Sequence, residues 1–216
     1  MLDLMSMRKV AKEGRHPVQE RSAARISKVL KAAVRMLEDV GPEKTSIPSV
    51  AEASGVPRAA IYPFFPDKYA LFSRLAEMYM EELTTVFQGS KIARVRSWQA
   101  WVEAAVKAIA DFYNSRPAAS ALLLTGTFAE SGHAAHKAKN LVIGRTFRAN
   151  AKRMNALKAM PAEPDAAVIA VEIAFACMKY GYEHEGAISP AICKEASRAV
   201  IAYLSAWNEM PNPGRE

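Results

Sequence analysis

The spacing of small and apolar residues near the N-terminus constrains the fold more than any other feature of the sequence. Residues 26–37 carry apolar side chains at positions i, i+3, i+4, i+7 and i+11, which predicts one helix with a single apolar stripe. The members of that stripe are Ile26, Val29, Leu30, Ala33 and Leu37. Gly41 and Pro42 follow, and this pair predicts the end of the helix.

Two short helices are predicted after that break. Thr45 or Ser46 can cap the first of them, because a hydroxyl accepts a hydrogen bond from a free backbone amide at a helix start. Gly55 supplies the turn between the two helices, since glycine enters the left-handed conformation without steric cost. Pro57 then opens the second short helix.

The spacing of three residues in this region predicts a helix-turn-helix motif at about residues 46–65. Two helices that cross steeply need a small residue at their contact, a glycine at the turn, and an apolar residue that locks the second helix. Ala51, Gly55 and Ile61 meet these needs in that order.

The rest of the chain predicts helices and no strand. Its apolar periods are separated mostly by proline and glycine, which mark helix boundaries. The expected helices span residues 68–88, 97–114, 117–129, 133–160, 164–185 and 190–208. The predicted fold class is all-α, with a flexible basic arm at 1–20, a three-helix domain containing the motif at 21–74, and a larger helical domain at 75–216.

Basic residues are concentrated in the arm and the first helix. The whole chain has a net charge of +7, and residues 8–35 alone hold nine lysines and arginines against two glutamates. Such a run indicates a polyanionic partner such as nucleic acid, or simply a solvated helix face.

The sequence predicts neither export nor a membrane span. No apolar signal-peptide core follows the basic N-terminal residues, and the longest uncharged runs are too short to cross a bilayer. The two cysteines, Cys177 and Cys193, lie apart in separate helical patterns. We therefore expect a soluble, cytoplasmic protein with reduced thiols, a disulfide between the two cysteines being the alternative.

Residues 25–72 resemble the DNA-binding domain of the TetR family of transcriptional regulators. Four features carry the resemblance: the first helix ending at Gly41, the Thr45–Ser46 pair, the spacing of Ala51 and Gly55, and Tyr62 followed by Phe65 and Lys68. The resemblance implies a homodimer in which each subunit places its third helix in the major groove of a double-stranded DNA operator. It also implies a C-terminal domain that pairs the subunits through its last two long helices and encloses a small-molecule pocket.

The residues expected to contact DNA lie in and around the motif. Arg58, on the first turn of the third helix, can make a bidentate contact to guanine or grip a phosphate; the alternative is a solvent-exposed arginine. Tyr62 and Lys68 match family positions that bind the DNA backbone, although Tyr62 could instead be a core aromatic, and Thr45 and Ser46 could be plain helix caps. The full predicted set is Arg25, Thr45, Ser46, Pro57, Arg58, Ala59, Tyr62 and Lys68.

The sequence departs from the family pattern at Pro63 and Phe64, where relatives often have a tyrosine and then a histidine or tyrosine. Proline cannot continue a helix comfortably, so the third helix should end near Tyr62. Phe64 has no polar atom for a phosphate, although it could pack on sugar or a thymine methyl. We expect fewer polar DNA contacts here than relatives make.

In the C-terminal half, Glu172 stands alone among apolar residues in 166–178, where it could receive a cationic ligand or an arginine, or point to solvent. Aromatic residues that could line a pocket, or belong to an ordinary core, include Trp101, Phe128, Phe147 and Phe175. His133 and His136 are spaced to share a metal, but no third ligand stands at a convincing spacing, so no metal site is predicted.

The sequence therefore predicts a one-component regulator, a repressor that binds a palindromic operator as a dimer and is released by a small-molecule effector. A transcriptional activator of the same family is the alternative, and a helical interaction module without operator binding is a further one. An enzyme is not expected, because no nucleophile elbow, phosphate loop or catalytic carboxylate pair is present. No cofactor is predicted, and the effector cannot be read from the sequence.

Overall fold

The computed structural model describes residues 15–87, 95–125 and 130–209, although only the backbone is described near some ends of these segments. The described residues form helices and no strand. The predicted all-α fold class is confirmed. The chain divides into two compact units, Met1–Leu71 and Phe72–Glu216, each of which is described by itself below.

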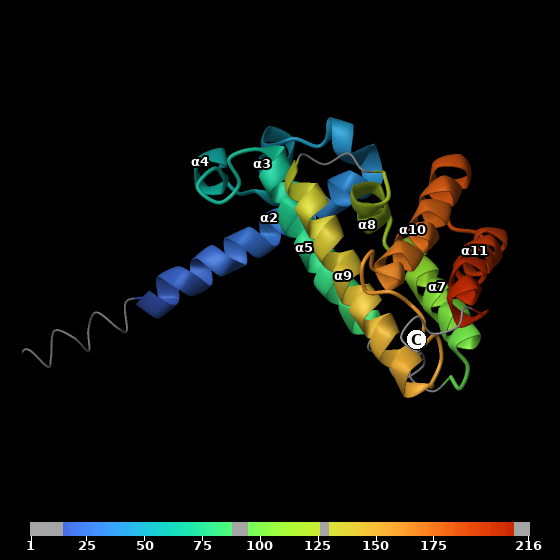
Figure 1. Cartoon of the computed structure of the whole chain (residues 1–216). Helices are drawn as coiled ribbons and strands as arrows, with labels where there is room; N and C mark the ends of the chain where they lie inside the picture. Colours follow the sequence, from blue (N-terminus) through green and yellow to red (C-terminus); the bar gives the residue numbers. More distant parts are fainter. Residues whose placement is uncertain (1–14, 88–94, 126–129, 210–216) are drawn as a thin grey trace, which may run out of the picture. The chain divides into compact units, whose positions relative to one another are not determined.

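The N-terminal unit contains α2 (Arg15–Lys44), α3 (Ile47–Ser54) and α4 (Arg58–Ile61), labelled in Figure 1. Gly41 interrupts α2 with φ 80° and ψ 172°, so the regular helix ends where the sequence predicts. The predicted apolar stripe packs inward, and Val29 and Leu37 are almost completely buried. The short α3 packs against both α2 and α4.

The predicted flexible arm at 1–20 is wrong for residues 15–20, which already belong to α2. Pro17 does not prevent this, because a proline in the first turn of a helix lacks an amide hydrogen that would have no intrahelical partner anyway. Residues 1–14 lie outside the described part of the chain.

The long helix α5 (Lys68–Phe87) follows, and the boundary between the two units falls within it. The helices after α5 are α7 (Trp98–Asn114), α8 (Pro117–Leu123), α9 (Glu130–Arg153), α10 (Ala166–Glu185) and α11 (Pro190–Glu209). These bounds agree with the predicted helices to within two residues, apart from three ends. The helix predicted at 117–129 ends at Leu123, and the one predicted at 133–160 begins at Glu130 and ends at Arg153. After Arg153, Asn155 and Leu157 have left-handed φ values of 55° and 54°, which a right-handed helix cannot contain.

In the C-terminal unit, α10 packs against both α9 and α11, and α11 also packs against α7. Two glycines allow close approach. A Cβ atom on Gly144 of α9 would lie 2.9 Å from Val168 Cγ2, and one on Gly181 of α10 would lie 2.8 Å from Ile192 Cγ1. Both distances are shorter than ordinary carbon contacts, so α10 lies closer to its neighbours than larger residues would permit.

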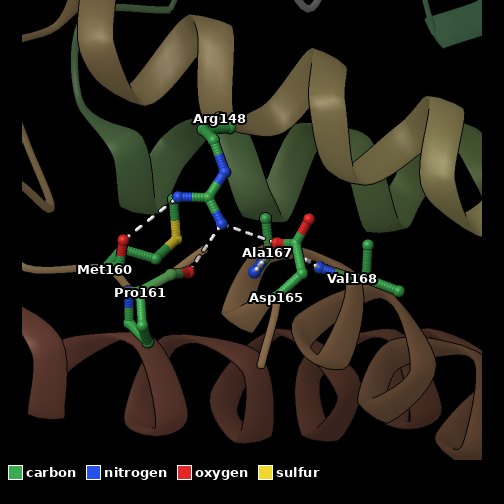
Figure 2. Close-up of polar contacts among 6 residues, drawn as sticks. All are labelled: Arg148, Met160, Pro161, Asp165, Ala167 and Val168. Atoms are coloured by element: carbon green, nitrogen blue, oxygen red, sulfur yellow. Dashed lines mark hydrogen bonds and ion pairs between the residues drawn. The ribbon is translucent and has the colours of Figure 1, made fainter. Parts of the chain in front are cut away.

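Arg148 joins the end of α9 to the start of α10, as Figure 2 shows. Its guanidinium donates to the carbonyl oxygens of Met160 at 3.1 Å and Pro161 at 2.7 Å, and to Asp165 Oδ1 at 2.6 Å. Asp165 in turn accepts hydrogen bonds from the Ala167 and Val168 amides and caps α10. Partial burial opposes its ionisation, but Arg148 and these amides outweigh that effect and lower the pKa of Asp165.

Candidate functional site

The start of α3 is fixed by a reciprocal pair of serines. Ser46 Oγ accepts from the Ser49 amide at 3.3 Å, and Ser49 Oγ accepts from the Ser46 amide at 3.0 Å. This capping box satisfies two backbone donors that a helix start otherwise leaves open. The predicted cap at Ser46 is confirmed, and its hydroxyl already serves the fold.

The turn between α3 and α4 has the predicted construction. Gly55 adopts φ 67° and ψ 17° and closes α3, and Pro57 directly precedes α4. Ala51 and Ile61 are both buried, with Ile61 only 1% exposed. The small residue, the turn glycine and the locking apolar residue therefore occupy the roles that their spacing predicts.

The outer face of α4 is open. Pro57, Arg58 and Ala59 are all exposed, so a long guanidinium projects next to a side chain small enough to permit close approach of another molecule. Tyr62 is 45% exposed. The alternative interpretation of Tyr62 as a core aromatic is therefore wrong.

The segment after α4 turns sharply. The amides of Phe64 and Phe65 both donate to the Ile61 carbonyl, at 2.9 and 3.0 Å, and Pro63 between them and the helix has no amide hydrogen to offer. The helix ends at Ile61 with Tyr62 as its cap, as predicted. Phe65 is buried and anchors the turn, whereas Phe64 is 44% exposed.

Thr45 does not present its hydroxyl to a ligand. Its side chain is completely buried, and Oγ1 donates to the Gly41 carbonyl at 2.8 Å. The predicted DNA contact of the Thr45 hydroxyl is therefore contradicted by the structure. The hydroxyl instead supports the kink that ends the regular part of α2.

Lys68, at the start of α5, already makes two hydrogen bonds within the N-terminal unit. Its ammonium donates to the Pro42 carbonyl at 3.3 Å and to the Glu43 carbonyl at 3.4 Å. An ammonium has three donors, so a phosphate oxygen can still bind the third. The same contacts hold the positive charge against the carbonyl groups at the end of α2.

The exposed face of α2 is basic. Arg25 is exposed together with Arg21 and Lys28, and these three side chains border a shallow groove with Ala24. They come from successive turns of one helix, so their charges lie on one side of it. Such a row of cations suits a polyanion with regularly spaced charges, such as a nucleic acid backbone.

The C-terminal unit contains a partly open apolar cavity of about 50 Å³. Of the predicted pocket residues, Trp101, Phe147 and Phe175 line it, and the rings of Trp101 and Phe147 lie 5.1 Å apart. Phe128 lies outside the described residues. The described lining residues are Leu83 of α5; Trp101, Val102, Ala105, Val106, Ile109 and Tyr113 of α7; Ile143 and Phe147 of α9; Ala167, Ala170, Val171, Ala174, Phe175 and Met178 of α10; and Val200 and Leu204 of α11.

Glu172 is absent from that lining, and of the possibilities that the sequence left open, the one consistent with its exposure is a side chain that points to solvent. Its side chain is exposed, and its carboxylate accepts a hydrogen bond from Nδ2 of the buried Asn140 on α9. The carboxylate on this apolar helix thus takes part in a contact between α9 and α10 and is exposed at the surface.

Sequence reasoning missed most of the cavity because an aliphatic residue has the same pattern whether it lines a cavity or fills a core. Tyr113 is the clearest omission. It is 1% exposed, it lines the cavity, and its phenol oxygen is buried. A tyrosine on the apolar face of a helix is the one signal that could have indicated it, since a buried hydroxyl normally needs a partner.

The structure also bears on the possible metal site, the two cysteines and the question of a membrane span. The side chains of His133 and His136 lie outside the described part, and no group of three or more potential metal ligands occurs among the described side chains. Cys177 and Cys193 are both free thiols, and burial raises the pKa of each. None of the helices in the described residues combines the length and apolar character that a membrane span needs.

The comparisons with known proteins agree with this geometry. Residues 29–75 match the family model described as bacterial regulatory proteins, tetR family. No curated protein matches the chain.

Solved structures match over most of the chain. FadR, a fatty acid degradation regulator from Bacillus halodurans, is 10% identical with a TM-score of 0.65, covering 83% of this chain and 94% of that one. A TetR-family transcriptional regulator from Streptomyces coelicolor is 19% identical with a TM-score of 0.62, covering 84% and 98%. A TetR-family regulator from Syntrophomonas wolfei is 15% identical with a TM-score of 0.63, covering 89% and 99%. At these identities the likeness shows the fold.

Proposed function

We propose that this chain, whose residues 29–75 match the model of the tetR family of bacterial regulatory proteins, is a cytoplasmic repressor that binds a palindromic operator as a homodimer. A small molecule in the apolar cavity of the C-terminal unit releases the DNA. The observation that supports DNA reading most directly is the exposed start of α4, where Arg58 and Ala59 project beside the half-exposed Tyr62.

In this proposal α4 enters the major groove. Arg58 lies on its first turn and donates two parallel hydrogen bonds to a guanine edge, the commonest specific contact between protein and DNA. Ala59 keeps the helix close to the bases because its methyl group occupies little space. A bidentate contact of this kind is worth about 1–3 kcal/mol of discrimination against the wrong base.

The DNA backbone is held by residues around α4. Tyr62 offers a phenol hydroxyl at one end of the helix, and the start of α3, next to Ser46, carries the positive end of the helix dipole. Lys68 and Arg25 supply positive charge. These contacts fix the register of the protein on the duplex and carry little sequence information themselves.

The homodimer forms through α10 and α11 in this proposal. One face of α10 carries partly exposed apolar side chains one turn apart, Ile173, Cys177 and Tyr180. Tyr180 is 56% exposed, and its ring stacks on that of His184 at a centroid distance of 4.0 Å. An exposed apolar stripe on a long helix is a typical surface for pairing with a second copy.

Release of DNA follows from two conformations of the dimer. An effector shifts the equilibrium only if it binds the released conformation more tightly than the DNA-bound one. The cavity of about 50 Å³ is smaller than a typical ligand pocket of about 300–1,000 Å³. Occupation must therefore move the surrounding helices apart, which is a change that the dimer can transmit to the two DNA-reading helices.

The test is fluorescence anisotropy with the protein's own promoter DNA and with random duplex of the same length. The wild-type protein should prefer the promoter, and its affinity should fall steeply as salt rises. The double variant Arg58→Ala with Tyr62→Ala should lose that preference, while Arg145→Ala, which removes an exposed charge from α9, should keep it. Equal binding of both duplexes by the wild-type protein would refute the proposal.

Phe64→His tests the corner where the sequence departs from its relatives. Because Phe64 is exposed, histidine should fold normally there and restore a polar contact. Operator affinity should stay the same or increase. A large loss of affinity with unchanged thermal stability would show that the phenyl ring itself contacts DNA.

A further inference from the structure

Tyr113 carries a buried polar group that the fold does not use. Its side chain is 1% exposed, and its phenol oxygen has no hydrogen-bond partner among the described residues. Leaving a buried hydroxyl without a partner is unfavourable, because the group gives up its hydrogen bonds to water and gains none. A buried hydroxyl of this kind can donate a hydrogen bond to an acceptor group that enters from outside the protein.

The surroundings of this phenol are apolar. It shares the cavity wall with Met178 of α10 and Leu204 of α11, both essentially buried, and the described lining residues include no charged side chain. Burial raises the pKa of the Tyr113 phenol far above its ordinary value. The group is therefore a neutral O–H donor at physiological pH.

The position of Tyr113 is fixed by its neighbours along the chain. Its carbonyl accepts a hydrogen bond from Ser120 Oγ at 2.8 Å. The adjacent Asn114 exchanges two hydrogen bonds of 2.8 Å with the backbone of Ile188, which ties the end of α7 to the connection between α10 and α11. The phenol is thus presented from a rigid point of the wall, a requirement for a specific contact.

We propose that Tyr113 determines the specificity of the cavity, and that the cavity takes a neutral, mainly apolar compound with one hydrogen-bond acceptor, such as a ketone or ether oxygen. The acceptor binds the Tyr113 hydroxyl, and the hydrocarbon part lies against the aromatic rings of Trp101 and Phe147. A carboxylate or an ammonium is rejected, because no described lining residue can compensate its charge. This inference rests on the proposed function in one respect: the compound that binds in the cavity is taken to be the effector that releases DNA.

Small residues on α10 make room for such a compound. Ala167, Ala170 and Ala174 face the cavity one turn apart, where larger residues would fill it. The cavity of about 50 Å³ is nevertheless smaller than the roughly 150 Å³ that an engineered cavity offers to benzene. Binding must therefore enlarge the cavity, and the additional space can form beside the three alanines of α10.

The experiment uses three probes of nearly the same shape: acetophenone, its hydrocarbon counterpart α-methylstyrene, and the benzoate anion. Affinities for the full-length protein are measured by calorimetry and by the rise in melting temperature that ligand binding produces. Wild-type protein should bind acetophenone more tightly than α-methylstyrene and should not bind benzoate measurably.

The variant Tyr113→Phe removes the phenol oxygen alone. Its affinity for acetophenone should fall roughly fivefold to tenfold, the usual worth of one hydrogen bond, while its affinity for α-methylstyrene should stay within about twofold. Tyr203→Phe, which changes a tyrosine of α11 outside the described lining, is the matched control and should change neither. Without ligand, Tyr113→Phe should melt at the same or a higher temperature than wild type.

Four results would overturn the inference. A clear fall in the melting temperature of ligand-free Tyr113→Phe would mean that the hydroxyl already has a partner inside the protein. Tighter binding of benzoate than of acetophenone would mean that the cavity contains a cationic group. If acetophenone did not bind at its solubility limit, or if Tyr113→Phe lost affinity equally for acetophenone and α-methylstyrene, the proposed hydrogen bond from Tyr113 to the ligand would be refuted.

These results are separable from the proposed function. If acetophenone binds through Tyr113 but does not release promoter DNA, the proposed release mechanism fails and the assignment of Tyr113 stands. If promoter DNA is bound specifically and the cavity prefers benzoate, the assignment fails and the DNA-binding function stands.

Discussion

Replacing Gly144 with alanine tests the close contact between α9 and α10. The added Cβ would lie 2.9 Å from Val168 Cγ2, 3.2 Å from the Val168 nitrogen and 3.3 Å from its Cα. The methyl contact could be relieved by a change of rotamer, but the two backbone contacts cannot. The first turn of α10 would have to move away by a few tenths of an ångström.

Two opposing terms decide the magnitude. Alanine favours a helix over glycine by about 1 kcal/mol, which would stabilise α9. Overpacking a well-filled contact costs about 1–3 kcal/mol, and here it also disturbs the Asp165 cap of α10, whose hydrogen bond to the Val168 amide is already long at 3.4 Å. We expect a net loss of about 1 kcal/mol, which lowers the melting temperature of a chain of this size by about 2–4 °C.

Thermal denaturation followed by circular dichroism measures this effect. Arg145→Ala is the matched control, because Arg145 is exposed on the same helix and its replacement should change stability by less than about 0.5 kcal/mol. Val168→Ala combined with Gly144→Ala should restore only part of the loss, since it removes the methyl contact and leaves the backbone contacts. A higher melting temperature for Gly144→Ala than for wild type would refute the close approach, because helix propensity alone would then decide the outcome.

Three further changes test other parts of the structure. Arg148→Ala should destabilise the protein by about 1–3 kcal/mol. Because folding lowers the pKa of Asp165, the stability that its ionised carboxylate contributes is present above the ordinary carboxyl pKa and is lost as pH falls through the folded value. The free energy of unfolding should therefore depend less on pH in the acid range in the variant than in wild type. Thr45→Val should cost about 1 kcal/mol in urea denaturation by leaving the Gly41 carbonyl without its partner, yet leave the operator affinity of the folded fraction unchanged; a selective loss of DNA binding would restore the predicted contact. Ala170→Val should fill the cavity, raise the melting temperature and abolish acetophenone binding, and undiminished binding would place the ligand elsewhere.

The helix-turn-helix could be predicted because its signals act over a few residues. Gly41 and Gly55 mark positions with left-handed φ, Ser46 caps the helix that follows it, and Pro63 ends the one before it. Each is a property of one residue and its immediate backbone, so the order of residues is enough to predict the local conformation.

The partners of individual polar groups could not be predicted in the same way. The hydroxyl of Thr45 and the ammonium of Lys68 can both bind a phosphate. In the structure the Thr45 hydroxyl donates to the Gly41 carbonyl, and the Lys68 ammonium donates to the Pro42 carbonyl near the end of α2. Glu172 similarly serves a contact with Asn140 of another helix. Which partner a polar side chain finds depends on distances across the fold, which spacing in the sequence does not contain.

The amino-acid sequence by itself determined the all-α class, the helix-turn-helix and the position of Arg58 on the first turn of α4, because periodicity and turn chemistry are local. Only the tertiary structure decided that an apolar space exists in the C-terminal unit and that Tyr113 faces it. The physical reason is that a cavity is a shortfall of packed volume between helices far apart in the chain, and an apolar side chain has the same periodicity beside a cavity as within a filled core.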